Sequence, residues 1–278
     1  MSKPSLIEPT DDEKQAIIEM RSGFKSEFSS NPDLYYDRDF LLVLENDWEV
    51  HRYLLAADGD PKAGLKRLID SMKWRKALAV WDMTETDFPK EFFEMLRLGK
   101  ARDGSTLIIS RAQYYIPINE WRELFKKFFV FVMETLDKMN TGKGLTVLVD
   151  CQDSGLSNVD FDFIMFLKPI QSKYYPGLLK LQLNCDIPWI LTSISQVILS
   201  LMPAKTRKLM TFVKRSQLTD YINEDNIPSY LGGTGISLMS WTPSDCQSAE
   251  EVAQNQSFSN KNLQKLVSHL RPLLDIYS

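Results

Sequence analysis

The sequence is poor in histidine and cysteine, and this shortage limits the chemistry that it could perform. Its 278 residues include only His51 and His269, and its three cysteines, Cys151, Cys185 and Cys246, lack CxxC spacing. Neither a disulfide framework nor a zinc site is indicated, and two histidines offer few possibilities for a Ser-His-Asp or Cys-His catalytic arrangement. We expect no metal, no cofactor and a reducing compartment, with His51 in a structural role.

Motifs for nucleotides and membrane spans are missing as well. The sequence has no GxGxxG, GxxxxGK[ST] or GxSxG motif, so it lacks the motifs typical of nucleotide-binding proteins and α/β-hydrolases. No segment reaches the ~18 uninterrupted apolar residues of a spanning helix, and the first residues lack the apolar core of a signal peptide. The net charge of −4 argues against a nucleic-acid partner. We expect a soluble, cytoplasmic protein.

The hydrophobic pattern divides the chain into three parts. Apolar residues at helical spacing over residues 1–95 predict a small helical bundle. Residues 96–234 alternate β-rich runs with helical stretches, which predicts an α/β fold with a largely parallel sheet and crossover helices. A polar linker and a docking helix are expected over residues 235–278. The predicted strands are Ser105–Ser110, Leu145–Asp150, Leu178–Cys185 and Thr211–Val213.

The strongest catalytic candidates are two carboxylates at the end of a predicted strand. Asp150 and Asp153 lie in the segment VDCQDSG, where ligands of open α/β sheets bind. The same residues also suit a strand-to-helix turn, and Ser157 with Asp160 resembles a helix-capping pair. No second group of ligands completes a site. We therefore favour the structural interpretation and expect no enzyme.

The segment Pro188–Arg215 combines an uncharged helix with a basic cluster. Hydroxyl and amide side chains occupy most of its polar face, so the helix could enter a membrane interface at low cost. Lys205, Arg207 and Lys208 follow, and each cation contributes about 1 kcal/mol near an anionic leaflet. A crossover helix packed on the sheet explains the pattern equally well. The apolar face consists of Ile190, Leu191, Ile194, Val197, Ile198, Leu201 and Met202.

With these segments in view, the chain resembles the CRAL-TRIO family of lipid-binding modules from about Arg38 to Thr234. The likeness rests on several segments in a fixed order, and within the family it is greatest to the lipid-binding half of motile sperm domain-containing proteins. These segments are LKRLIDSMKWRKAL, RDGSTLIISRAQYY, LTVLVDCQDSGLS, SKYYPGLLKLQLNCDIPW and YLGGT.

The resemblance implies an apolar lipid pocket between a mixed, mostly parallel sheet and helices, closed by a mobile gate helix over 188–202. It implies non-enzymatic binding and intermembrane transfer of a lipid, with transient membrane docking through the basic residues. An alternative is an interaction module with a static or filled pocket, whose protein partners the sequence does not identify. The expected lining residues are Leu107, Ile109, Leu145, Val147, Phe163 and Phe166.

The resemblance is incomplete where the family recognises headgroups. Lys208 matches a lysine of the inositol-phosphate site, but Gly177 replaces the glutamate of that site. Leu145 and Val147 replace the hydroxyl residues that contact phosphocholine. The resemblance therefore implies either a neutral apolar ligand or a lipid whose headgroup stays near the basic cluster.

Overall fold

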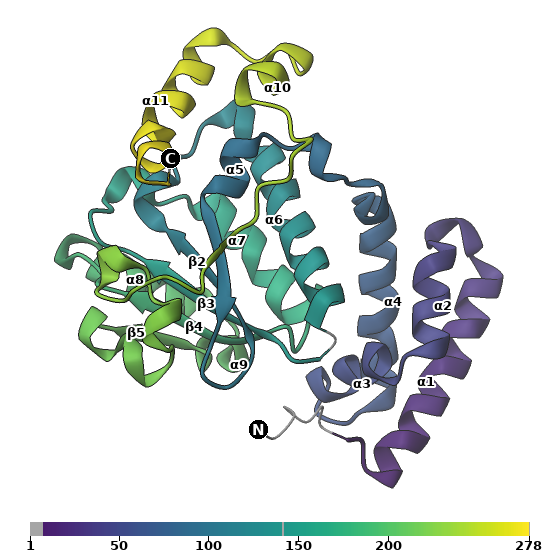
Figure 1. Cartoon of the computed structure of the whole chain (residues 1–278). Helices are drawn as coiled ribbons and strands as arrows, with labels where there is room; N and C mark the ends of the chain where they lie inside the picture. Colours follow the sequence, from purple (N-terminus) through teal and green to yellow (C-terminus); the bar gives the residue numbers. More distant parts are fainter. Residues whose placement is uncertain (1–7, 141, 278) are drawn as a thin grey trace.

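The N-terminal part of the chain forms a helical bundle beside the rest of the molecule (Figure 1). The computed structural model describes residues 8–140 and 142–277. The bundle contains α1 (Asp11–Ser30), α2 (Asp37–Glu45), α3 (Asp47–Ala56) and α4 (Pro61–Ala77).

Local capping signals set where these helices begin. Thr10 and Glu13 form a capping box at the start of α1, and the Asp60 side chain accepts hydrogen bonds from the first turn of α4. Pro61 occupies the first position of α4, where its missing N–H has no intrahelical partner to lose. Inside the bundle, Ile17, Phe24, Val50, Leu54 and Leu68 pack into a core of their own.

The sheet is mixed and mostly parallel, as the sequence predicted. Its strand order is β5-β4-β3-β2-β1-β6; β2 through β5 pair in parallel, and β1 and β6 pair antiparallel. Sequence analysis missed β1 and β6, because LRLGK contains three polar or glycine residues and β6 has only two residues. The strands are β1 (Leu96–Lys100), β2 (Thr106–Arg111), β3 (Leu145–Asp150), β4 (Leu179–Cys185), β5 (Met210–Val213) and β6 (Met239–Ser240).

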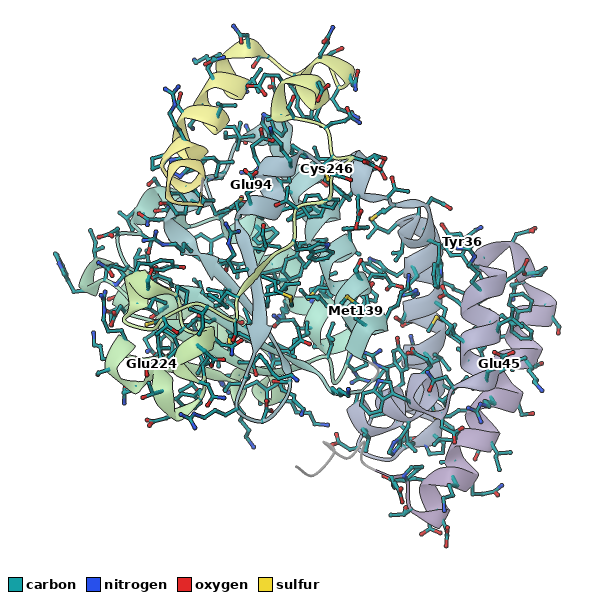
Figure 2. All side chains as sticks on the ribbon, in the orientation of Figure 1. Tyr36, Glu45, Glu94, Met139, Glu224 and Cys246 are labelled. Carbon is teal, nitrogen blue, oxygen red and sulfur yellow. The ribbon has the colours of Figure 1, made fainter. Side chains whose placement is uncertain are left out.

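The two faces of the sheet are covered differently. Successive short turns and 3-10 segments over residues 215–231 cover one face, where Leu148 and Leu183 pack against Leu218 and Ile222. The opposite face packs against α5 (Lys90–Glu94), α6 (Asn119–Asn140) and α7 (Phe161–Pro169). Side chains fill much of the space between these layers (Figure 2).

The C-terminal part returns to the same hydrophobic core. After the extended segment that includes β6, α10 (Ala249–Asn255) and α11 (Asn260–Tyr277) lie against α5 at the top of the view in Figure 1. Val252, Leu266 and Leu270 are buried in the cluster that also contains Phe92 and Trp121. The docking helix expected at the end of the chain therefore packs on the edge of the α/β domain.

A buried ion network joins the bundle to the α/β domain. Arg75 of α4 donates to both carboxylate oxygens of Glu134 on α6, over 2.5 and 2.8 Å, and to Asp39 of α2 over 3.0 Å. The Tyr175 hydroxyl donates to Glu134 over 2.8 Å. Burial opposes ionisation of Glu134, but the charges of Arg75 and Lys138 prevail and lower its pKa to about 2.

Replacing Glu134 by Gln should destabilise the protein in a pH-dependent way. The pKa of Glu134 is about 2 in the folded protein, against an ordinary value of 4.5. The Glu134 charge therefore contributes its full stabilisation of the fold at pH values above 4.5, and this contribution is lost as the pH falls toward 2. We expect E134Q to lower the free energy of unfolding by about 3 kcal/mol at pH 7 and by clearly less at about pH 3.5. Urea unfolding at both pH values measures this difference.

Glu123→Gln is the matched control, because Glu123 lies on the same helix with a side chain that is 76% exposed. It should change the free energy of unfolding little at either pH. A constant gap between wild type and E134Q across this range would contradict the role of the charge.

Candidate functional site

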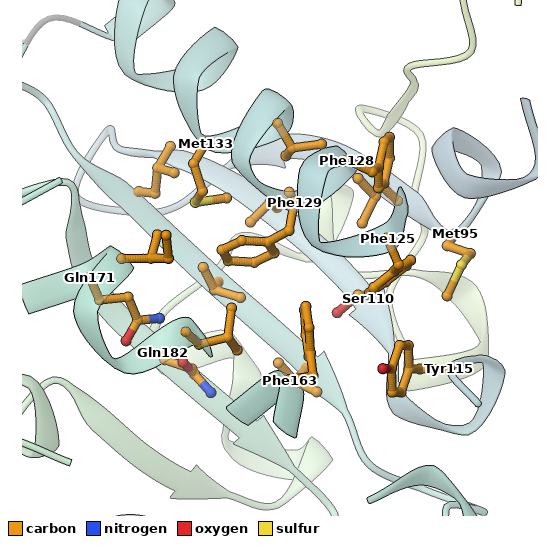
Figure 3. A pocket seen from close by; sticks show the side chains of 18 of the residues that line it. Met95, Ser110, Tyr115, Phe125, Phe128, Phe129, Met133, Phe163, Gln171 and Gln182 are labelled. Atoms are coloured by element: carbon orange, nitrogen blue, oxygen red, sulfur yellow. The ribbon is translucent and has the colours of Figure 1, made fainter. Parts of the chain in front are cut away.

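An apolar cavity of about 270 Å³ lies between the sheet and α6. Figure 3 shows it from close by, with aromatic and methionine side chains around most of its wall. Two amide side chains lie at one end. The lining residues are Phe92, Met95, Leu96, Ile108, Ser110, Arg111, Ala112, Tyr115, Phe125, Phe128, Phe129, Val132, Met133, Leu145, Val147, Val149, Asn158, Phe163, Leu167, Ile170, Gln171, Tyr175, Leu178, Leu179 and Gln182.

The periodicity of α6 and β3 produces two walls of this cavity. On α6, Phe125, Phe128, Phe129, Val132 and Met133 recur at the spacing of one helical face. On β3, every second residue from 145 to 149 points the same way, because side chains alternate across a strand. A helix face and a sheet face with large apolar side chains therefore oppose each other.

Three of the six expected lining residues, Leu145, Val147 and Phe163, line the cavity. Phe166 packs against the same hydrophobic cluster but does not line the cavity.

For Leu107 and Ile109 the expectation is corrected: they are buried on the opposite face of the sheet, against the segment of residues 215–231. Their neighbours Ile108 and Ser110 line the cavity instead. The set with Leu107 and Ile109 is the more apolar of the two alternating sets of β2, which made it the natural choice for an apolar wall, but it packs into the filled core and the set with Ile108 and Ser110 faces the cavity.

The carboxylates that sequence analysis weighed as catalytic have structural surroundings. Asp150 is fully buried; its Oδ2 accepts a hydrogen bond from Arg111 Nε over 3.0 Å, and its Oδ1 accepts one from the Gln152 N–H. Burial raises the pKa of Asp150, with Arg111 and the backbone acting against the rise. Asp153 has a positive φ of 61° in the turn after β3. The contacts of Asp150 and the turn conformation of Asp153 support the structural interpretation of these residues.

A π-helical turn shapes the polar end of the cavity. Residues Ile170–Tyr174 continue α7 as a π-helix after Pro169, and the Tyr175 N–H donates to the Ile170 carbonyl over 2.8 Å. This wide turn brings both Gln171 and Ile170 to the cavity wall. The sequence gives no signal for Gln171, because neither helical spacing nor residue type distinguishes it from the neighbouring residues.

The expected gate lies outside the cavity wall in this structure. A 3-10 turn over Trp189–Leu191 leads into α8 (Thr192–Leu201), and α8 has no buried residue although it is rich in apolar side chains. Trp189 is 86% exposed and Val197 is 51% exposed. No residue between 188 and 202 lines the cavity. α8 nevertheless connects the parallel strands β4 and β5, and its Ile194 and Ile198 side chains are partly buried. Met202, which follows α8, is buried.

The basic cluster follows α8 on a short helix, α9 (Ala204–Arg207). Lys205 forms an exposed ion pair with Asp58 of the N-terminal bundle, at 2.5 Å. Arg207 and Lys208 are exposed. None of the three lines the cavity.

Gly177 has a conformational reason to be glycine. Its φ is +77°, a left-handed conformation that disfavours other residues, and a Cβ there would lie 3.3 Å from the Trp48 ring. A glutamate at this position would require both a strained backbone and displacement of the Trp48 ring. The local backbone and the Trp48 ring therefore explain why position 177 carries glycine and not the glutamate of the inositol-phosphate site.

Other site types find no support in the described ranges. Within residues 8–140 and 142–277, no group of His, Cys, Asp or Glu side chains could hold a metal ion. Over the same residues, no helix is long and apolar enough to cross a membrane. All three cysteines are free, and burial raises the pKa of the Cys151 and Cys185 thiols to about 12, which leaves them protonated at neutral pH.

Comparisons with known proteins agree on one family. The sequence profile described as the CRAL/TRIO domain matches residues 94–233. A CRAL-TRIO domain-containing protein of Schizosaccharomyces pombe is 25% identical over 218 residues, which cover 73% of this chain and 49% of that protein. The chain thus spans about half the length of this curated relative.

A solved structure shares the fold. The crystal structure of Sfh5 superposes with a TM-score of 0.62 at 15% sequence identity, covering 90% of this chain and 98% of Sfh5. The likeness to motile sperm domain-containing proteins is not addressed by these comparisons and stays a prediction.

Replacing Gly177 by Ala should destabilise the protein, because alanine disfavours the left-handed conformation and its Cβ would press on Trp48. We expect a loss of about 1–2 kcal/mol in the free energy of unfolding, measured by urea titration. Gly155→Ala is the control, since Gly155 has an extended backbone with φ −139° and open space around its Cα. Equal effects of the two substitutions would contradict this account of Gly177.

Proposed function

Because the chain belongs to the CRAL/TRIO family, we propose that it binds a lipid in the cavity beside α6 and carries it between membranes without changing it chemically. The observation that carries this proposal is the cavity itself, whose wall is almost entirely hydrocarbon and aromatic. Each CH₂ group moved from water into such a wall contributes about 0.8 kcal/mol.

The energetics of an empty cavity support a ligand. Unfilled apolar volume costs about 24 cal/mol per Å³, so a closed and empty cavity of about 270 Å³ would cost on the order of 6 kcal/mol. A hydrocarbon ligand would offset this cost by restoring contacts to the lining side chains. The cavity volume is just below that of typical ligand pockets, which measure about 300–1,000 Å³.

We further propose that α8 is the gate. Its apolar side chains are not buried here, and extended residues flank it: Pro188 before the 3-10 turn, and Met202 and Pro203 before α9. Rotation about these residues would move α8 as a unit, either toward the cavity or into a membrane interface. Such movement would allow a lipid to enter and leave.

Membrane docking is assigned to the cluster of Lys205, Arg207 and Lys208. All three lie directly after the gate, so attraction to an anionic surface would hold α8 at the interface. The proposed association is peripheral and reversible, on cytoplasmic membrane surfaces.

Native mass spectrometry of the purified protein, followed by analysis of the released lipid, tests the carrier function directly. A stoichiometric lipid that exchanges with vesicles is the expected result. A protein that is empty and takes up nothing from mixed vesicles would contradict the proposal and favour the interaction module.

The gate assignment predicts that Ile194→Asp with Val197→Asp will slow lipid transfer between vesicles by at least about tenfold, because charged side chains resist entry into an apolar interface. Ser193→Asp with Gln196→Asp is the matched control, because it adds the same charge to exposed polar positions of α8. A fluorescent-lipid transfer assay compares the two pairs. Similar rates for both would refute the gate assignment.

Charge reversal at the basic cluster should weaken binding to anionic vesicles. Arg207→Glu with Lys208→Glu should lower the vesicle partition coefficient by at least about thirtyfold at low salt, from about 1 kcal/mol lost per cation. Lys261→Glu with Lys265→Glu on α11 changes the net charge equally at exposed positions and should have little effect. Sedimentation with phosphatidylserine vesicles makes the comparison; equal loss in both variants would indicate only a net-charge effect.

A further inference from the structure

Most of the polar groups around the cavity have hydrogen-bond partners within the protein. Tyr115 donates to Asp160 over 2.7 Å, Tyr175 donates to Glu134, and Asn158 donates to the Gln113 and Tyr115 carbonyls. Gln182 donates to Asn184 Oδ1 over 3.0 Å. The Oε1 atom of Gln171 is buried and has no hydrogen-bond partner.

An unsatisfied amide oxygen in an apolar cavity is costly, and it can be relieved by a donor on a ligand. Figure 3 places the side chain of Gln171 at the end of the cavity that also holds Gln182, away from Tyr115. A ligand occupying the apolar body would therefore meet carboxamide groups at one end, while Ser110 lies toward the other.

The electrostatics of the wall exclude a buried phosphate at that end. Arg111 is the one charged residue among those that line the cavity, and it already pairs with Asp150 and lies 4.3 Å from the centre of the Tyr230 ring. A phosphate drawn inside would have no free cation, and an unpaired buried anion is strongly unfavourable. The cations of α9 do not line the cavity.

We propose that the cargo is a neutral lipid with a single hydroxyl, and that this hydroxyl donates its hydrogen to Gln171 Oε1. A hydroxyl both donates and accepts, so it complements the carboxamide in either orientation of the amide group. The modest volume favours one compact or single-chain hydrocarbon body over two acyl chains. This inference rests on the proposed lipid-binding function.

The test compares alcohols with the hydrocarbons that lack only the hydroxyl. Full-length protein is equilibrated with phosphatidylcholine vesicles that contain cholesterol or cholestene, and hexadecanol or hexadecane, and bound ligand is quantified by mass spectrometry relative to vesicle content. For at least one pair, wild type should prefer the alcohol by about tenfold, the effect of one hydrogen bond to an otherwise unsatisfied buried group.

Gln171→Leu removes the acceptor while keeping the apolar bulk, so it should abolish the preference while hydrocarbon binding is retained or increased. Retained hydrocarbon binding also shows that the variant is folded. Gln182→Leu is the matched control in the same cavity: its amide already bonds to Asn184, so the preference for the alcohol should persist.

The possible failures are distinguishable. Binding of both members of each pair without preference, or a preference that survives Gln171→Leu, would overturn the role of Gln171 while leaving lipid binding intact. Preferential uptake of phosphatidylinositol from mixed vesicles would overturn the neutral-cargo inference. No uptake of any lipid would overturn the proposed function itself.

Discussion

The placement of the N-terminal bundle depends on the buried guanidinium of Arg75. It contacts Glu134 on α6 and Asp39 on α2, and Glu134 in turn accepts a hydrogen bond from Tyr175. Removing one member of such a group leaves a buried charge without a partner, so the elements that supply it have one favourable arrangement. The Tyr175 ring lines the cavity. The bundle thereby helps to position Tyr175 in the cavity wall, although no residue of α1 to α4 lines the cavity.

The sheet has a tightly packed core on one face and the apolar cavity on the other. On one face, alternate side chains of β2, β3 and β4 interdigitate with the residues of 215–231. On the other, aromatic rings of α6 meet rings of α5 edge to face, as Phe125 does with Phe92 and Phe128 with Phe93. Rings held by such contacts cannot collapse into the remaining space without losing them. The cavity thus persists beside a rigid aromatic wall, and an apolar ligand can occupy it.

Two apolar surfaces of this protein differ in their relation to water. The cavity is lined by side chains that are buried or partly buried, whereas none of the apolar side chains of α8 is fully buried and Val197 is exposed. An exposed apolar helix next to cations has the chemical character of an interfacial segment. Gln171 adds a buried, unpartnered oxygen to the cavity wall. The proposed carrier would therefore use α8 and α9 to contact the membrane and the cavity to distinguish the cargo.

The sequence by itself determined the α/β class, the helical lead-in, the bounds of β3 and the uncharged character of α8, because these follow from local periodicity and composition. It also excluded the common catalytic motifs. It did not determine which alternate residues of β2 face the cavity, since both faces of that strand are covered by other layers and alternation alone does not indicate which layer contains the cavity. Only the tertiary structure decided this orientation, the pairing of Arg75 with Glu134 and the unpartnered oxygen of Gln171. Each depends on contacts between residues that are distant in sequence, and no local sequence pattern indicates such contacts.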